Sequence, residues 1–205
     1  MPSDPVAEAR KSALRRQLRA ARRALSPAQQ RQHATAIAHR LRGVRAFRAA
    51  RHIAYYFADD GEIDLSRLPR AAARAARRWY LPIVRPFGPP WLWFARHRPG
   101  APLRPNRYGI PEPRPRRPLR RANQLDLVLL PLVGFDARCQ RLGRGGAFYD
   151  RTLAFLRGRR HWRRPVPIGV AHEVQRVATL PAEPWDVPLA AVITETGVYR
   201  CWRAL

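Results

Sequence analysis

The residues best suited to chemistry lie in one glycine-rich segment, residues 135–151, which reads FDARCQRLGRGGAFYDR. Gly143, Gly145 and Gly146 permit backbone conformations that other residues rarely adopt, so successive N–H groups can converge on one anion. A helix is predicted to begin directly after these glycines, and its positive N-terminus favours the same anion. Two arginines flank the glycines with positive charge. The segment therefore predicts a site for a phosphate group.

Two common phosphate motifs are absent from this segment. No lysine followed by Ser or Thr closes it, as in a P-loop, and its glycine spacing differs from that of the dinucleotide-binding fingerprint. Both of those protein classes are therefore disfavoured. On the loop alone, a glycine-rich turn that binds no ligand remains an open alternative.

Two helices and a series of strands are predicted around the segment. Residues 6–24 carry Leu14 and Leu18 at helical spacing, and residues 27–43 follow Ser26, which suits a helix N-cap. Short runs rich in apolar, aromatic and β-branched residues predict the strands. The predicted strands are residues 52–57, 79–84, 91–95, 125–131, 166–172, 189–195 and 197–202.

The remaining segments complete an alternating pattern. A helix is predicted from Asp64 or Leu65 to about Arg77, and another from the glycine loop to about Leu156. Residues 97–121 are dense in Pro and Arg and predict an extended surface loop.

The alternation of strands and helices indicates the fold class. Residues 125–131, LDLVLLP, are nearly continuous apolar sequence, which is typical of a central strand covered on both faces. We expect an α/β three-layer sandwich with a mainly parallel central sheet, helices on both faces and ligands at the carboxyl ends of the strands. Residues 1–205 are expected to form a single domain.

Positive charge is spread along the whole chain. The formal net charge is +26, and of the 40 cationic residues every one except Lys11 is an arginine. Basic proteins often bind nucleic acids, because clustered cations gain affinity by releasing condensed counterions. Here the arginines occur in predicted helices, loops and strands alike, which is more typical of biased coding than of a binding face. A basic nucleic-acid-associated α/β protein is the second hypothesis, although no specific nucleic acid is expected.

The cysteines and histidines predict neither a disulfide nor a zinc site. Cys139 and Cys201 lie far apart in a sequence without a recognisable secretory leader, so both are expected to be free, reduced thiols. No run of residues approaches membrane-spanning length, and a cytoplasmic protein without a membrane partner is expected. The histidines show no metal-ligand spacing, and no chemistry is expected of them. They are His33, His39, His52, His97, His161 and His172.

The glycine-rich segment resembles the signature of the 5-formyltetrahydrofolate cyclo-ligases, also called methenyltetrahydrofolate synthetases. That signature has the form Phe-Asp, then Arg-Leu-Gly, then glycines and aromatics, and then Tyr-Asp, and this chain matches each part. The resemblance extends over nearly the whole chain in six ordered blocks. The other five blocks are Lys11 with Arg15, Glu62, residues 108–113 (YGIPEP), Gln175, and Trp185 with Asp186.

The resemblance implies an enzyme that uses ATP as co-substrate and Mg²⁺ as cofactor. ATP would phosphorylate the formyl oxygen of 5-formyltetrahydrofolate, and the second folate nitrogen would then attack the activated carbon. The products would be 5,10-methenyltetrahydrofolate, ADP and phosphate. Phosphoryl transfer depends on positioning and on cations around the phosphates more than on a protein nucleophile, so no catalytic residue is assigned. The expected partners are this folate and ATP, and the expected state is a monomer.

The resemblance also assigns binding residues. Asp150 and Asp186 match the Mg²⁺-binding positions, and oxygen ligands suit this hard cation. At the folate positions, an aromatic ring can stack on the pterin and a carboxylate can accept its N–H groups. The residues assigned to ATP are Lys11, Arg15, Arg141, Leu142, Gly143, Arg144, Gly145, Gly146, Ala147, Phe148 and Tyr149. The residues assigned to the folate are Phe57, Glu62, Tyr108, Arg144, Gly145, Gly146, Ala147, Phe148 and Gln175.

Several of these assignments have a purely structural alternative. Lys11 and Arg15 also suit a solvated helix face. Asp150 also suits the first turn of a helix, and Asp186 also suits a turn. Phe57 at a strand end also suits the hydrophobic core.

The chain departs from the usual pattern of the family at two positions. Cys139 and Ala147 stand where glycines are typical. Ala147 either narrows the space for substrate or tolerates the backbone angles of the loop. An inactive relative of the enzyme is therefore the third hypothesis.

Overall fold

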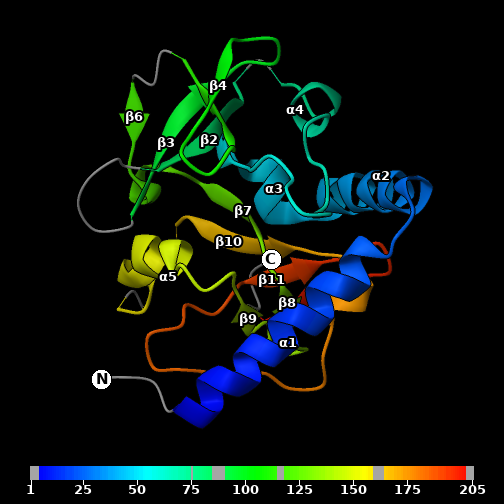
Figure 1. Cartoon of the computed structure of the whole chain (residues 1–205). Helices are drawn as coiled ribbons and strands as arrows, with labels where there is room; N and C mark the ends of the chain where they lie inside the picture. The colour runs from blue at the N-terminus through cyan, green and yellow to red at the C-terminus, as the bar shows by residue number, and fades with distance from the viewer. Residues whose placement is uncertain (1–4, 75, 85–90, 115–117, 159–163, 202–205) are drawn as a thin grey trace.

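A central sheet of eight strands organises the computed structural model, which describes residues 5–74, 76–84, 91–114, 118–158 and 164–201 (Figure 1). The strands lie in the order β12-β11-β10-β7-β1-β2-β3-β6. Their bounds are β1 His52–Ala54, β2 Arg78–Val84, β3 Leu92–His97, β6 Leu119–Arg120, β7 Leu127–Pro131, β10 Val166–Val170, β11 Ala191–Ile193 and β12 Val198–Arg200.

The middle of this sheet is parallel and its edges are antiparallel. Strands β11, β10, β7, β1 and β2 run in one direction, while β12 pairs antiparallel with β11 and β3 pairs antiparallel with β2 and β6. Strand β1 pairs with β2 on one side and with β7 on the other, so the strand order reverses between β1 and β7. In open α/β sheets, such a reversal leaves a crevice at the carboxyl ends of the two strands.

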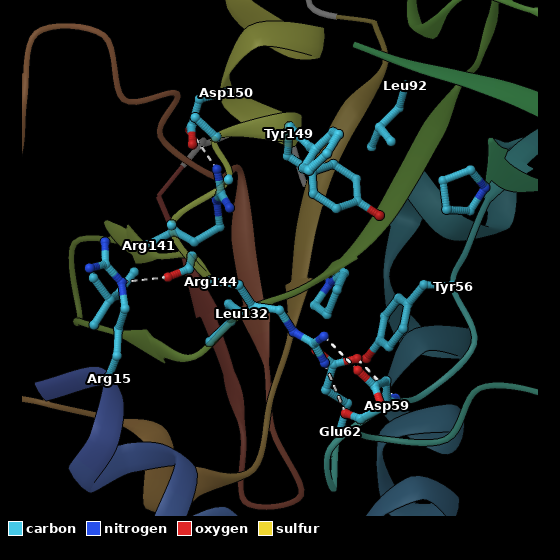
Figure 2. A pocket seen from close by; sticks show the side chains of 18 of the residues that line it. Arg15, Tyr56, Asp59, Glu62, Leu92, Leu132, Arg141, Arg144, Tyr149 and Asp150 are labelled. Carbon is cyan, nitrogen blue, oxygen red and sulfur yellow. Dashed lines mark hydrogen bonds and ion pairs between the residues drawn. The ribbon is translucent and has the colours of Figure 1, made fainter. Parts of the chain in front are cut away.

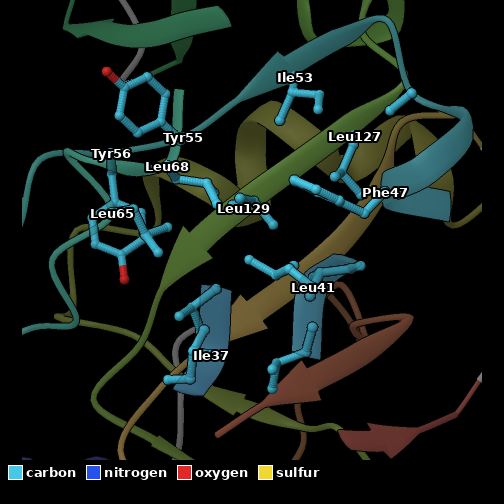
Figure 3. Packing of buried hydrophobic residues seen from close by; sticks show 14 of the residues in the cluster. Ile37, Leu41, Phe47, Ile53, Tyr55, Tyr56, Leu65, Leu68, Leu127 and Leu129 are labelled. Atoms are coloured by element: carbon cyan, nitrogen blue, oxygen red, sulfur yellow. The ribbon is translucent and has the colours of Figure 1, made fainter. Parts of the chain in front are cut away.

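Helices cover both faces of the sheet. Side chains alternate along a strand, so Leu127 and Leu129 of β7 pack toward α2 (Pro27–Gly43) and α3 (Arg45–Ala49) (Figure 3). Val128 and Leu130 pack on the opposite face, where α5 (Phe148–Leu153) and η2 (Ala154–Leu156) lie. The prediction of a three-layer α/β sandwich with a mainly parallel sheet is therefore confirmed.

Helix α1 (Pro5–Arg23) packs at the carboxyl ends of the strands. It contacts η3 (Glu173–Gln175), which follows β10, and the hairpin of β8 (Gly134–Phe135) and β9 (Arg141–Leu142), which follows β7. The approach is close at Gly134, where an added Cβ would lie 2.5 Å from Leu18 Cδ1. Among the described residues, no helix combines the length and the apolar character that crossing a membrane requires.

The two N-terminal helices agree closely with their predicted ranges. Ser26 caps α2 as expected: its Oγ accepts the Gln29 N–H at 3.2 Å, and its own N–H donates to Gln29 Oε1 at 2.9 Å. This reciprocal pair satisfies two backbone donors that a helix start would otherwise leave unpaired.

The helix predicted from Asp64 or Leu65 to about Arg77 is wrong over most of its length. Only α4 (Leu68–Ala71) forms, and Ala75 lies outside the described residues. The Arg77 guanidinium turns inward instead and donates to the backbone oxygens of Phe47 and Ala72, each at 2.8 Å. These bonds need an irregular chain before β2, so local helical propensity gives way to tertiary contacts.

The extended loop predicted over residues 97–121 contains short strands. Strands β4 (Leu103–Pro105) and β5 (Pro111–Pro113) form a two-stranded ribbon, and β6 joins the edge of the main sheet. Prolines are tolerated there because an edge ribbon leaves many N–H groups unpaired. Residues 115–117 and Trp202, at the end of the last predicted strand, lie outside the described residues.

The prediction of free thiols is also wrong. Cys139 and Cys201 form a disulfide with Cα atoms 6.2 Å apart. The fold brings them together because Leu189 N–H donates to Cys139 O at 3.2 Å and Cys201 N–H donates to Ala190 O at 2.9 Å. Their separation of 62 residues in sequence conceals this proximity.

Candidate active site

A cavity of about 630 Å³ lies at the carboxyl ends of β1 and β7 (Figure 2). Tyr56 and Phe57 follow β1, Pro131 ends β7, Leu132 follows it, and all four line the cavity. The crevice expected at the reversal of strand order is therefore present. Its volume is in the range of small-molecule and cofactor sites.

The glycine-rich loop forms one wall of this cavity. Its position is fixed by α1, because Arg15 Nε donates to Gly143 O at 3.0 Å. Gly145 has a φ of 104°, which favours glycine. Cys139 and Ala147 have φ values of 60° and 50°, so both non-glycine residues adopt the left-handed conformation that glycine would favour. At both departures from the family pattern, the backbone thus has a conformation that suits glycine.

Arg144 joins the glycine-rich loop to the loop after β1. Its guanidinium donates to Glu62 Oε1 at 2.9 Å, to Asp59 Oδ2 at 2.6 Å and to Asp59 O at 3.1 Å (Figure 2). Glu62 is buried, and burial raises its pKa above the usual value although Arg144 and Arg22 oppose the shift. The contact places a carboxylate acceptor at one end of the cavity.

Tyr56 adds an unsatisfied hydroxyl to the same end. Its side chain is buried, lines the cavity, and has a hydroxyl without a hydrogen-bond partner in the part of the chain that the structure describes. Burial raises the pKa of Tyr56 well above its usual value, so the hydroxyl keeps its proton. A buried polar group without a partner is costly in free energy, which suggests that a ligand completes it.

The other end of the cavity holds paired cations and carboxylates. Lys11 Nζ lies 2.9 Å from Glu183 Oε1, and Arg141 Nη2 lies 2.5 Å from Asp150 Oδ1. Asp186 Oδ2 accepts the Glu183 N–H at 2.8 Å. Burial, with a smaller contribution from Asp150, raises the pKa of Asp186. The carboxylates of Asp150 and Asp186 supply oxygen ligands of the kind that a hard cation prefers.

Aromatic rings from distant segments meet over the cavity. Tyr108 and Phe148 stand edge to face with ring centroids 6.2 Å apart. Tyr108 is exposed on a turn that Asn106 organises, because Asn106 Oδ1 accepts the N–H groups of Tyr108 and Ile110 at 2.8 and 3.1 Å. Such an Asx turn fixes the ring in reach of the loop.

Phe57 lies between the cavity and the hydrophobic core. It lines the cavity and also packs edge-on against Tyr55 and His97 with centroid distances of 6.0 and 5.7 Å. It is therefore part of the wall between cavity and core.

Gln175 is the exception among the predicted site residues. It is buried outside the cavity lining, and its Nε2 donates to Leu132 O at 2.7 Å and to Val133 O at 3.0 Å. Its Oε1 accepts the His172 N–H at 2.9 Å. Gln175 thus holds the backbone below the cavity, whereas all the other residues assigned to ATP, folate or Mg²⁺ line it.

Sequence reasoning missed several residues that shape the cavity. Glu183 pairs with Lys11. In the sequence it belongs to no recognised motif, although it lies two residues before Trp185. Arg22 is fully buried, donates to Asp60 O at 2.8 Å and to Leu132 O at 3.4 Å, and so ties the loop after β1 to the end of β7. An arginine among many arginines gave no signal.

The sequence comparisons agree with this geometry. The sequence profile of the 5-formyltetrahydrofolate cyclo-ligase family matches residues 7–195. The chain belongs to this family. It is 39% identical over 186 residues to the 5-formyltetrahydrofolate cyclo-ligase of Escherichia coli K12, covering 89% of this chain and 99% of that protein. It is 36% identical over 183 residues to the enzyme of Haemophilus influenzae, covering 88% and 95%.

Two solved structures of methenyltetrahydrofolate synthetases have the same fold as this chain. The 5,10-methenyltetrahydrofolate synthetase of Aquifex aeolicus superposes with a TM-score of 0.77 and 29% identity, covering 93% of this chain and 92% of that one. The synthetase of Mycoplasma pneumoniae gives a TM-score of 0.66 and 25% identity, covering 90% and 98%. The predictions of family membership and of a ligase in folate metabolism are therefore confirmed.

Proposed function

We propose that this chain converts 5-formyltetrahydrofolate to 5,10-methenyltetrahydrofolate while ATP becomes ADP and phosphate. The observation that carries the proposal is one continuous cavity, which has a carboxylate and aromatic rings at one end and cations with carboxylates at the other. The glycine-rich loop contacts both ends. A folate and a nucleotide bound there would meet at the loop.

The end near Glu62 suits the pterin of the folate. An ionised Glu62 accepts N–H donors of the ring, and Phe57 and Tyr108 offer aromatic surfaces for stacking. The unpartnered Tyr56 hydroxyl provides one more hydrogen bond to the ligand. When the folate binds, Arg144 would either leave Glu62 or share this carboxylate with the N–H groups of the pterin.

The end near Lys11 suits the phosphates of ATP. Lys11, Arg15 and Arg141 supply positive charge, and the loop from Gly143 to Tyr149 supplies backbone donors. Lys11 Nζ lies 2.9 Å from Glu183 Oε1, and phosphate oxygens would compete with this carboxylate for the ammonium group.

Asp150 and Asp186 would hold Mg²⁺. Each carboxylate has an oxygen, Asp150 Oδ2 and Asp186 Oδ1, that accepts no hydrogen bond within the described ranges. When bound with the nucleotide, Mg²⁺ offsets negative charge on the phosphate oxygens. The residues of the chain then orient the phosphates through Lys11 and Arg141.

The reaction balances without a protein nucleophile. The formyl oxygen attacks the γ-phosphorus, the bond from that phosphorus to the bridging oxygen breaks, and ADP leaves. The second folate nitrogen attacks the activated carbon and loses its proton, the carbon–oxygen bond breaks, and phosphate leaves with the formyl oxygen. The cavity contributes by holding both substrates in contact and by limiting access of water to the activated group.

The cellular setting is proposed on the same basis. The lining residues extend from Glu8 to Asp186 of one chain, so a single domain acting as a monomer suffices for the site. We place the activity in the cytoplasm, where ATP is available. No nucleic acid has a role in the reaction.

An absorbance assay for methenyl-folate formation tests the proposal. We expect product only when 5-formyltetrahydrofolate, ATP and Mg²⁺ are all present, with the enzyme-free rate subtracted. A folded sample that forms no product under these conditions would refute the proposed activity and support an inactive relative.

A further inference from the structure

Three metal-ligating side chains meet outside the cavity. His33 lies on α2, His172 follows β10 and Glu195 follows β11, and their ligand atoms all lie within 4.8 Å of one another. None of the three lines the cavity described above. Sequence spacing could not indicate this cluster, because His33 and His172 are 139 residues apart.

Hydrogen bonds orient His172 as they orient metal-binding histidines. His172 is fully buried, and its Nε2 lies 3.1 Å from Gly61 O, so Nε2 carries the proton and donates it to this carbonyl. Nδ1 is then left with its lone pair directed at the cluster. A ligating histidine usually donates its other ring N–H to a backbone carbonyl or carboxylate in this way.

The remaining donors converge on the same point. His33 Nδ1 lies 2.9 Å from His172 Nδ1 and 3.5 Å from Glu195 Oε1. In a tetrahedral zinc site with bonds of about 2.0–2.1 Å, two ligand nitrogens lie about 3.3 Å apart. The two rings therefore need to separate by only a few tenths of an ångström. The side chains of His33 and Glu195 are 16% and 13% exposed, so the cluster borders solvent.

We propose that His33 Nδ1, His172 Nδ1 and the Glu195 carboxylate bind one divalent transition-metal ion of the Zn²⁺ class. Two imidazole nitrogens and one carboxylate favour such an ion over Mg²⁺ or Ca²⁺, which prefer oxygen ligands only. Water completes the coordination. Without metal, a proton on His33 Nδ1 bridges the same two nitrogens, so metal binding displaces that proton.

The bound ion would act on the fold and on no step of the reaction. It links α2 to the ends of β10 and β11, and through His172 it supports Gly61, the residue before Glu62. Because the ion binds the folded state, it raises the free energy of unfolding as its concentration exceeds the dissociation constant. This site is independent of the proposed function, and its test does not need activity.

Calorimetric titration of the full, metal-stripped chain with Zn²⁺ tests the site. The buffer contains excess Mg²⁺, which occupies carboxylate sites elsewhere. We expect one ion per chain and a rise in the melting temperature with Zn²⁺. His33→Ala and Glu195→Gln should each weaken binding at least about tenfold, since even outer-shell changes weaken metal sites about ten- to a hundredfold. The matched control is His39→Ala, an exposed histidine on the same helix, which should bind like the wild type.

Co²⁺ provides a second readout through its visible absorption. We expect the bands of a four-coordinate site in the wild type and in His39→Ala, and their loss in His33→Ala. His33 and Glu195 are only partly buried, so both variants should fold, and their circular dichroism in chelator should match that of the wild type. Equal Zn²⁺ affinity in wild type, His33→Ala and Glu195→Gln would overturn the proposal, as would an absence of binding in the wild type.

Discussion

Arg144 Nη2 lies 2.9 Å from Glu62 Oε1, although 82 residues separate them in the chain. One partner belongs to the glycine-rich loop and the other to the loop that follows β1. The contact therefore joins the proposed nucleotide wall of the cavity to the proposed folate end. Glu62 is buried and Arg144 is partly exposed, so solvent screens this ion pair less than a fully exposed pair. Rearrangement of the pair should accompany folate binding.

Glu62→Gln should raise KM for 5-formyltetrahydrofolate by roughly ten- to a hundredfold. This change corresponds to the binding free energy of about one charge-assisted hydrogen bond. The pKa of Glu62 is raised by burial, so the carboxylate gains its proton at a higher pH than a solvated glutamate does. In the wild type, kcat/KM for the folate should therefore decline as pH falls through this raised pKa.

The matched control is Asp64→Asn, an exposed carboxylate near Glu62 that does not line the cavity. It should retain the wild-type KM and pH profile, while Glu62→Gln should lose the acid decline. Initial rates are measured at saturating ATP, with the enzyme-free rate subtracted at each pH. An unchanged acid decline in Glu62→Gln would assign the titration to another group.

Lys11→Arg should keep the fold but lower kcat/KM for ATP by roughly ten- to a hundredfold, about 1.4–2.7 kcal/mol of transition-state stabilisation. Lys11 is the only lysine in a chain of arginines, and it lies in the cavity with Nζ 2.9 Å from Glu183. An ammonium group fits among phosphate oxygens as a compact charge, whereas a guanidinium is wider and planar.

The control for Lys11 makes the opposite exchange on the same helix. Arg16→Lys alters an exposed position of α1 and should leave the kinetics for ATP unchanged. Wild-type kinetics in Lys11→Arg would show that the lysine is an accident of composition.

Asp150→Asn and Asp186→Asn should each shift the Mg²⁺ dependence of the rate to higher concentrations, because a neutral amide is a poorer ligand for a hard divalent cation. Titrations of Mg²⁺ at fixed ATP compare them with Asp64→Asn, which should match the wild type. Unchanged curves in both cavity variants would exclude a shared metal site at these carboxylates.

Ala147→Gly should raise the free energy of unfolding by about 0.5–1 kcal/mol. A left-handed conformation costs an L-residue about 1–2 kcal/mol, partly offset by the greater entropy of glycine in the unfolded chain. Ala147 has a φ of 50°. Ala13→Gly, at an exposed position within α1, should lower stability by about 1 kcal/mol. Urea denaturation measures both.

Ala147→Gly also distinguishes an active enzyme from an inactive relative. If the wild type is active, Ala147→Gly should leave turnover within a few-fold, because the loop already has the backbone shape of a glycine. Activity that appears only in Ala147→Gly would identify the natural chain as an inactive relative.

The sequence predicted the features that local patterns encode. The apolar run at residues 125–131 indicated the central strand, Ser26 indicated the cap of α2, and the spacing of the glycines indicated a loop at the carboxyl end of a strand. The family signature then predicted about half of the residues that line the cavity. Their assigned roles stay predictions.

Features that depend on distant contacts could not be predicted. Arg77 donates to the carbonyl oxygens of Phe47 in α3 and of Ala72 just after α4, where a helix was predicted. Cys139 lies beside Cys201 although 62 residues separate them in sequence. His33 and His172 likewise meet only in the folded chain. Spacing in sequence carries no information about such pairs.

The fate of the formyl oxygen tests the central claim most directly. The purified protein is supplied with ATP, Mg²⁺ and 5-formyltetrahydrofolate that carries ¹⁸O in its formyl group, and the released phosphate is analysed by mass spectrometry. We predict that methenyl-folate forms and that the ¹⁸O appears in the phosphate. Methenyl-folate formed with unlabelled phosphate, and with the ¹⁸O in water, would contradict phosphorylation of the formyl oxygen.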